Sequence, residues 1–166
     1  MKTIRLHEAL ITPGYFKSIS FPLDLTEQEL LSERHILDAR GEATMEIRNS
    51  ADIVTVRFFG EIEYKTECDR CLEQMQQKLI FDYTKDVKRI CDNEDFDGIM
   101  LSADESFDYE QEVVTEVLLS FPAKHLCKED CKGLCPVCGC NLNVTECSCE
   151  KKVPDPRLEV LRNLKW

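Results

Sequence analysis

Cysteines are crowded into one short segment of this chain. Seven of its ten cysteines lie between Cys127 and Cys149, and two of them form a Cys-x-x-Cys pair, Cys135 and Cys138, with Gly139 directly after it. Glycine at this position permits the positive φ that turns the following backbone amides toward the sulfurs. Because four thiolates are the usual ligands of a structural zinc ion, the pattern predicts a metal site.

The same cysteines could instead form a disulfide framework. The N-terminal residues Met1 to Glu8 lack the charged-then-apolar layout of a secretory signal peptide. A chain kept in a reducing cytosol uses such cysteines for metal or redox chemistry. No apolar run approaches the about 18 residues that a membrane span needs. We therefore expect a cytoplasmic protein that holds structural zinc and has no membrane partner.

Eight cysteines sort into four close pairs, which predicts two four-cysteine sites and one or two zinc ions per chain. Site one joins the last two pairs, Cys135, Cys138, Cys147 and Cys149. Site two would join Cys68, Cys71, Cys127 and Cys131. Spacing also allows a single site made of Cys127, Cys131, Cys135 and Cys138. Cys91 and Cys140 are left over, and we expect both to be spectator thiols because two complete pairs already fill a site.

Apolar residues alternate over residues 42–48, over 54–64 and again from Met75 to Tyr83, which predicts strands. The simplest arrangement is an antiparallel meander with Cys68-x-x-Cys71 at a hairpin tip. Helical spacing follows over 108–121, and Pro122 ends it. The sequence thus predicts an α+β fold, in which an antiparallel sheet with a packed helix carries a small C-terminal zinc module.

The predicted organisation has two parts. Residues 1–123 form the α+β domain, with strands over 34–90, an acidic loop over 91–107 and the helix over 108–121. The N-terminal third, including a short helical candidate at Thr26–Glu33, is assigned to the same sheet. Residues 124–166 form the zinc module and a tail helix, with Asp155 as its cap and Pro156 at its first position.

Acidic residues outnumber basic residues in the chain, whose net charge is −11. Most of the excess comes from residues 91–123, which hold ten acidic and no basic residues. Residues 93–104 resemble a calcium-binding loop imperfectly, and a solvated acidic loop explains them better. The overall charge argues against indiscriminate nucleic-acid binding, so any RNA contact must be local.

Several separated motifs together resemble the YceD-like family, the large ribosomal RNA subunit accumulation proteins. They are Cys68-Asp-Arg-Cys71-Leu-Glu, the helix end Leu118-Leu-Ser-Phe-Pro122, the segment from Leu126 through Gly139 to Asn143, and Asp155-Pro-Arg-Leu158. The resemblance starts near residue 34 and implies a bacterial cytosolic protein that supports synthesis, processing or stability of 23S ribosomal RNA. No catalytic motif stands beside it, so we expect a non-enzymatic factor in large-subunit ribosome biogenesis.

Two surfaces could contact the 23S rRNA or pre-ribosomal large subunit that the resemblance implies. Basic residues near the zinc module are RNA-binding candidates: Lys124, Lys128, Lys132, Lys151, Lys152, Arg157 and Arg162. Carboxylates of the acidic loop could instead bind a basic ribosomal protein: Asp92, Glu94, Asp95 and Asp97. The alternative function is a thiol-redox or metal-dependent enzyme that uses the Cys68-x-x-Cys71 pair.

Overall fold

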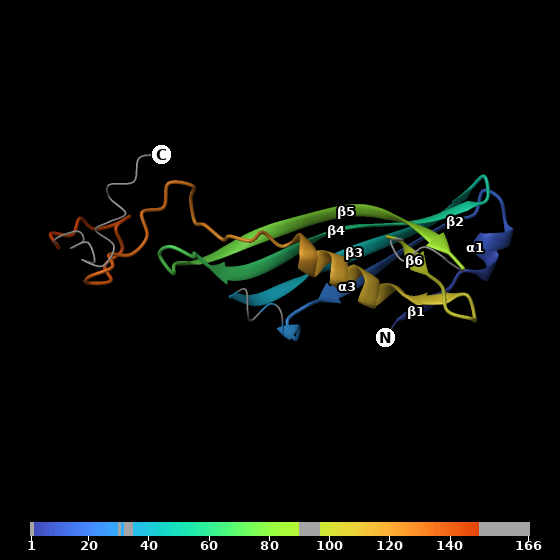
Figure 1. Cartoon of the computed structure of the whole chain (residues 1–166), viewed down its shortest axis with the longest axis horizontal. Coiled ribbons are helices and arrows are strands. Elements are labelled where there is room, and N and C mark those ends of the chain that lie inside the picture. Colours follow the sequence, from blue (N-terminus) through green and yellow to red (C-terminus); the bar gives the residue numbers. More distant parts are fainter. Residues whose placement is uncertain (1, 30, 32–34, 90–96, 150–166) are drawn as a thin grey trace, which may run out of the picture.

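Long strands with alternating side chains form the body of the molecule. The computed structural model describes residues 2–29, 31, 35–89 and 97–149. Three strands of 15 residues each, β3 (Ile36–Ser50), β4 (Ile53–Glu67) and β5 (Gln74–Lys88), pair antiparallel in sequence order. At about 3.3 Å per residue, each strand is roughly 50 Å long. The molecule is therefore elongated (Figure 1).

Two shorter strands extend this sheet. On one side β2 (Phe16–Asp24) pairs antiparallel with β3, and on the other β6 (Ile99–Met100) pairs parallel with β5. The strand order is β2-β3-β4-β5-β6. Of the N-terminal third, which the sequence assigned to this sheet, β2 joins it, whereas residues 3–5 pair elsewhere. The parallel β5–β6 pair makes the sheet mixed, which the expected antiparallel meander did not include.

A second, two-stranded sheet lies beside the first. It pairs β1 (Thr3–Arg5) antiparallel with β7 (Ser106–Asp108), and the short helix α1 (His7–Ile11) follows β1. Residues 99–100 and 106–107 are thus in strands where the sequence predicted only an acidic loop, and Asp108 ends β7 where the sequence predicted the first residue of the helix. The signal for them was the set of buried apolar residues in this segment, Ile99, Leu101 and Phe107.

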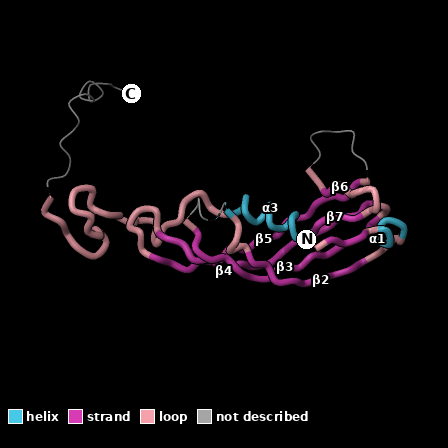
Figure 2. The backbone as a smooth tube through the Cα atoms, turned by 90° about the horizontal axis from the view of Figure 1, so that it is seen from below, coloured by secondary structure: helices cyan, strands magenta, loops and turns pink. Residues whose placement is uncertain are grey.

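One helix covers the inner face of the sheet. α3 (Tyr109–Ser120) matches the helix predicted over 108–121, and the Asp108 side chain caps it by accepting hydrogen bonds from the backbone amides of Glu110 and Gln111 at 3.1 Å. Figure 2 shows α3 lying along one face of the curved sheet. Val113 and Val117 are fully buried there, opposite the inward side chains of β3 and β4.

An ion-pair cluster fastens α3 to β5. The Lys85 ammonium contacts the carboxylates of Glu112 at 2.8 Å and Glu116 at 2.5 Å, and only 15% of the Lys85 side chain is exposed. Burial alone would lower the pKa of Lys85, but the hydrogen bonds to these two carboxylates raise it above its usual value. The lysine therefore stays charged and holds the helix against the sheet.

The close approach of β3 and β4 requires glycine at position 60. A Cβ on Gly60 would lie 2.2 Å from the Glu42 carbonyl oxygen and 2.9 Å from the ring of Phe81. Phe81 is the cross-strand partner of Gly60, so its ring fills the space that the missing side chain leaves.

Some predicted elements lie outside the described residues. The helical candidate Thr26–Glu33 is described only in part, and the tail helix of residues 154–164 is not described. Within the described part of the chain, no helix is long and apolar enough to cross a membrane.

Candidate metal centres at the cysteine-rich end

The first Cys-x-x-Cys pair lies where the sequence predicted it, at the tip of the β4–β5 hairpin. The tip is a tight turn in which the backbone amide of Leu72 donates to the carbonyl of Cys68 at 2.9 Å. Leu72 has φ +59°, a left-handed conformation that glycine adopts more easily. This turn directs the sulfurs of Cys68 and Cys71 to the same side.

Four sulfurs meet at this tip and form the first cluster, Cys68, Cys71, Cys127 and Cys131. All four sulfur atoms lie within 4.8 Å of one another. The Cys68 and Cys131 sulfurs are 3.8 Å apart, and those of Cys71 and Cys127 are 3.6 Å apart. Cys68, Cys71 and Cys131 are buried, and Cys127 is exposed. The cluster therefore joins the hairpin tip to the segment that follows α3 (Figure 1).

Polar contacts around the hairpin tip hold this segment in place. The backbone amide of His125 donates to the Asp69 carboxylate at 2.7 Å, and the Asp69 amide donates to the His125 carbonyl at 2.9 Å. The Arg70 guanidinium donates to the carbonyl of Cys131 at 2.8 Å. The buried His125 ring packs edge-on against Tyr64 of β4, with centroids 5.6 Å apart. The Asp-Arg pair between the two cysteines thus positions the other half of the cluster.

Backbone amides favour the thiolate form of Cys68. Burial would raise the pKa of this thiol, but amide hydrogen bonds from Cys127, Arg70 and Cys71 lower the pKa to about 6. Loss of solvent and the neighbouring sulfurs raise the pKa of Cys127 to about 12. Negative charge is therefore shared unevenly among the sulfurs, and a divalent cation at their centre would favour all four thiolates.

The second Cys-x-x-Cys pair repeats the same turn. The Gly139 amide donates to the Cys135 carbonyl at 2.9 Å, and Gly139 has φ +73°. The amide of Val137 donates to the Cys135 sulfur at 3.4 Å. Amide hydrogen bonds from Cys138 and Val137 lower the pKa of Cys135 to about 6. Both turns thus aim backbone amides at thiolates, as expected for Gly139.

Sulfurs gather at this turn into the second cluster, Cys135, Cys138, Cys140 and Cys147, whose sulfur atoms all lie within 4.8 Å of one another. The Cys147 thiol donates to the Cys135 sulfur at 3.3 Å. The chain folds back here because the Cys135 amide donates to the Cys140 carbonyl at 2.9 Å. Cys149 adjoins the cluster, since its backbone amide donates to the Cys147 sulfur at 3.4 Å.

The sulfur spacing fits zinc better than disulfides. Four sulfurs about 2.3 Å from a tetrahedral zinc ion lie about 3.8 Å apart, close to the 3.8 and 3.6 Å of the first cluster. A disulfide needs about 2.05 Å. All nine cysteines in the described part of the chain are free thiols. The donor sets therefore suit two zinc ions, although zinc itself stays a prediction.

The comparisons with known proteins place this end of the molecule in a family. The sequence model described as "Large ribosomal RNA subunit accumulation protein YceD" matches residues 57–165. The chain belongs to the YceD family. The matched region of this chain contains β5, α3 and both cysteine clusters. The family resemblance predicted from the motifs is thereby confirmed.

Curated relatives of this YceD family member come from mycobacteria. An uncharacterized protein of Mycobacterium tuberculosis is 34% identical over 79 residues, which cover 44% of this chain and 37% of the relative. One of Mycobacterium leprae is 32% identical over 85 residues, 48% of this chain and 38% of the relative. The chain thus aligns with less than two fifths of the relatives' length. No solved structure matches.

The structure brings together some predicted ligands and separates others. The four cysteines of predicted site two form the first cluster. The alternative single site, with Cys127 and Cys131 beside Cys135 and Cys138, is not assembled, because these pairs fall into different clusters. The second cluster contains Cys140, whereas the sequence predicted Cys149 as its fourth member. Spacing alone could not reveal this, since the fold-back between Cys135 and Cys140 creates it. Cys91 lies outside the described residues.

The predicted RNA-binding residues are only partly described. Lys124, Lys128 and Lys132 are exposed, and none of them forms an ion pair with a described residue. By contrast, Arg57 and Lys78 of the sheet pair with Asp82 and with Glu61. The remaining basic candidates, Lys151, Lys152, Arg157 and Arg162, lie outside the described residues.

The predicted protein-binding carboxylates are described only at Asp97. Its side chain is 95% exposed and lies 3.8 Å from the Lys85 ammonium. Asp92, Glu94 and Asp95 lie outside the described residues.

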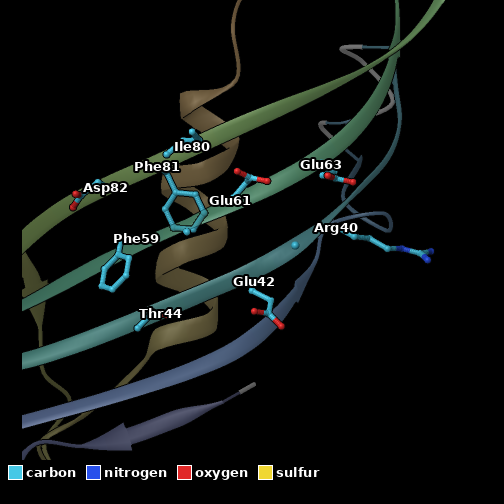
Figure 3. A pocket seen from close by; sticks show the side chains of 11 residues that line it. Arg40, Glu42, Thr44, Phe59, Glu61, Glu63, Ile80, Phe81 and Asp82 are labelled. Atoms are coloured by element: carbon cyan, nitrogen blue, oxygen red, sulfur yellow. The ribbon is translucent and has the colours of Figure 1, made fainter.

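A hollow of about 730 Å³ lies away from both clusters, on the outer face of the sheet. Figure 3 shows Phe59, Phe81 and Ile80 around it, with Glu42, Glu61 and other charged side chains at its margin. Its lining residues include no cysteine or histidine. None of the predicted metal ligands therefore lines this hollow.

Proposed function

We propose that this chain is a non-enzymatic factor in large-subunit ribosome biogenesis, which supports synthesis, processing or stability of 23S rRNA. Membership of the YceD family, named for accumulation of this RNA, is the observation that carries the proposal. The match covers the hairpin tip and both clusters, so these elements are the part of the chain on which the shared function would depend.

Zinc would act here as a structural cross-link. Cys68, Cys71, Cys127 and Cys131 would hold one ion, and the second cluster would hold another. A zinc ion closed by four thiolates has no open position for water or substrate, whereas catalytic zinc keeps one. The binding energy in such a site contributes directly to folding. Each ion would therefore fix the shape of the cysteine-rich end.

The exposed lysines of this end would contact rRNA phosphates. Lys124, Lys128 and Lys132 have no ion pair within the described part of the chain, so their charges are available to a polyanion. Glu129 and Asp130 are exposed among them, which keeps the local charge nearly balanced. Recognition would therefore depend on a rigid arrangement of a few lysines, and the clusters would supply that rigidity.

Depletion of the chain tests the function directly. The ratio of 23S to 16S rRNA should fall in cells that lack the protein and return when the wild-type gene is restored. Restoration with the Cys131→Ser variant should fail, and restoration with Cys91→Ser, a cysteine outside the four pairs, should succeed. An unchanged ratio in depleted cells would contradict the proposed function.

Charge variants separate the two routes to a partner. Replacing Lys124, Lys128 and Lys132 by alanine should weaken binding to 23S fragments and reduce the salt-dependence slope by about 2 to 3, since each lost phosphate contact removes about 0.7 to 0.9. Lys17→Ala is the matched control, because Lys17 is also an exposed lysine but lies on β2. Equal losses in the control and the triple variant would argue against a local RNA contact.

The acidic segment offers the second candidate contact. Its ten carboxylates between residues 91 and 123 could attract a basic ribosomal protein. Neutralising Asp92, Glu94, Asp95 and Asp97 should then weaken that association, most strongly at low salt. If RNA is the direct partner, the same changes should leave RNA binding equal or tighter.

The alternative function, a thiol-redox enzyme, makes a different prediction. Such an enzyme uses a Cys-x-x-Cys pair at a helix N-terminus, where the helix dipole lowers the thiol pKa. Here Cys68 and Cys71 lie between the strands β4 and β5. Turnover of a disulfide substrate by the zinc-loaded chain would support the redox function over the structural one.

A further inference from the structure

We propose that the second cluster is a five-thiol zinc site, in which Cys140 and Cys149 are interchangeable fourth ligands and one of the two is free at any time. This inference deepens the proposed structural role of zinc and rests on it. The fixed ligands would be Cys135, Cys138 and Cys147.

Five sulfurs are close enough to compete for one ion. The sulfurs of Cys135, Cys138, Cys140 and Cys147 lie within 4.8 Å of one another. Cys149 lies beside this group of four, because its backbone amide donates to the Cys147 sulfur at 3.4 Å. A structural zinc ion takes four ligands. One thiol therefore exceeds what a single ion can bind.

The two competing thiols reach the ion from different parts of the chain. Cys140 follows the second Cys-x-x-Cys turn and is held by the hydrogen bond from the Cys135 amide to its carbonyl, at 2.9 Å. Cys149 approaches from the far end of the loop, two residues beyond Cys147, whose sulfur accepts a hydrogen bond from its amide at 3.4 Å. Exchange between them moves only these two side chains, one leaving the ion as the other approaches, because the other three ligands stay in place.

The cysteines of the second cluster are more exposed to solvent than those of the first. Three of the four cysteines of the first cluster are buried, and the described cysteines near it supply no fifth sulfur. In the second cluster only Cys135 is buried, while Cys138 is exposed and Cys140, Cys147 and Cys149 are partly exposed. The first cluster is thus a closed site, and the second is open to ligand exchange and to thiol reagents.

Zinc analysis of the full-length chain, purified without added metal, tests the inference. The wild type should carry about two zinc ions. Cys140→Ser and Cys149→Ser should each keep both ions, and the double variant should lose one. Cys135→Ser, which removes a fixed ligand, should lose one ion by itself. Loss of an ion in either Cys140→Ser or Cys149→Ser alone would overturn the inference, because the ligand set would then be fixed.

A second measurement tests whether Cys140 and Cys149 alternate as the fourth zinc ligand in the wild type or whether one merely replaces the other when it is mutated. Brief treatment of the zinc-loaded wild type with iodoacetamide, followed by peptide mapping, should label Cys140 in some molecules and Cys149 in others. In Cys140→Ser the label on Cys149 should fall to near zero. Label confined to one of the two in the wild type would overturn the inference. A wild type without zinc would contradict the proposed metal sites themselves, which separates that failure from a fixed ligand set.

Discussion

Breaking the first cluster should destabilise the sheet, whereas breaking the second should not. The matched changes are Cys131→Ser and Cys147→Ser, each of which removes one thiolate from one cluster. The first cluster joins sulfurs that are 63 and 56 residues apart in sequence. The second joins Cys135 and Cys147, which are 12 residues apart. Only the first cross-link therefore spans β5 and α3.

The magnitude follows from the entropy of loop closure. A cross-link that closes a loop of about 60 residues stabilises the folded state by about 4 kcal/mol, and one that closes about 12 residues by about 3 kcal/mol. A zinc ion in the first cluster would stabilise the sheet, because it would hold Phe121 against Tyr64; the centroids of these two rings are 5.0 Å apart. A zinc ion in the second cluster would stabilise only residues 135–149. Cys131→Ser should thus lower the free energy of unfolding of the sheet by about 4 kcal/mol.

Urea unfolding followed by far-ultraviolet circular dichroism measures this loss, since the strands dominate the signal. Hydrogen exchange locates it: amides of β4 and β5 should exchange faster in Cys131→Ser and stay unchanged in Cys147→Ser. Equal effects of the two changes on these amides would refute the reasoning, as would full protection in Cys131→Ser.

Three further predictions concern the scaffold. Gly60→Ala should lower the free energy of unfolding by about 3 kcal/mol, because the added Cβ would collide with backbone atoms. Gly14→Ala should cost only about 1 kcal/mol, because Gly14 has open space around it but a positive φ. Urea denaturation compares the two variants, and equal losses would contradict the close approach. Leu72→Gly should raise the thermal midpoint, gaining up to about 1 kcal/mol by relieving the left-handed backbone; a lower midpoint would assign this leucine a packing role. Lys85→Met should lower the free energy of unfolding by about 3 kcal/mol at pH 7, because it leaves the carboxylates of Glu112 and Glu116 without their lysine partner. The pKa of Lys85 is raised above 10.5 in the folded state, so its contribution is complete below that pH and is lost as the pH rises through the folded value; a stability difference that persists at higher pH would contradict this.

The sequence predicted the long strands and α3 because their periodicity is regular. Alternation on both sides of Cys68-x-x-Cys71 was enough to place this pair at a hairpin tip, and Asp108 and Pro122 marked the helix ends. The strands β6 and β7 were missed because two or three residues are too short to show a period, and the surrounding acidic residues hid the buried Ile99 and Phe107.

The sequence was sufficient to predict which cysteines form close pairs in the candidate metal centres. Close pairs share a turn, so Cys68 with Cys71 and Cys135 with Cys138 could be grouped from spacing. Which further sulfur joins a turn depends on tertiary folding. The proximity of Cys140 to the second cluster arises from a backbone hydrogen bond between residues 135 and 140, which no spacing rule includes.

Crosslinking of the protein to RNA in growing cells, with sequencing of the bound fragments and mapping of the crosslinked peptides, tests the central claim most directly. We predict that fragments of 23S rRNA are enriched over 16S rRNA, and that the crosslinked peptides come from residues 124–149. RNA fragments recovered in proportion to cellular abundance, or crosslinks confined to the sheet, would contradict the proposal that the cysteine-rich end contacts large-subunit rRNA.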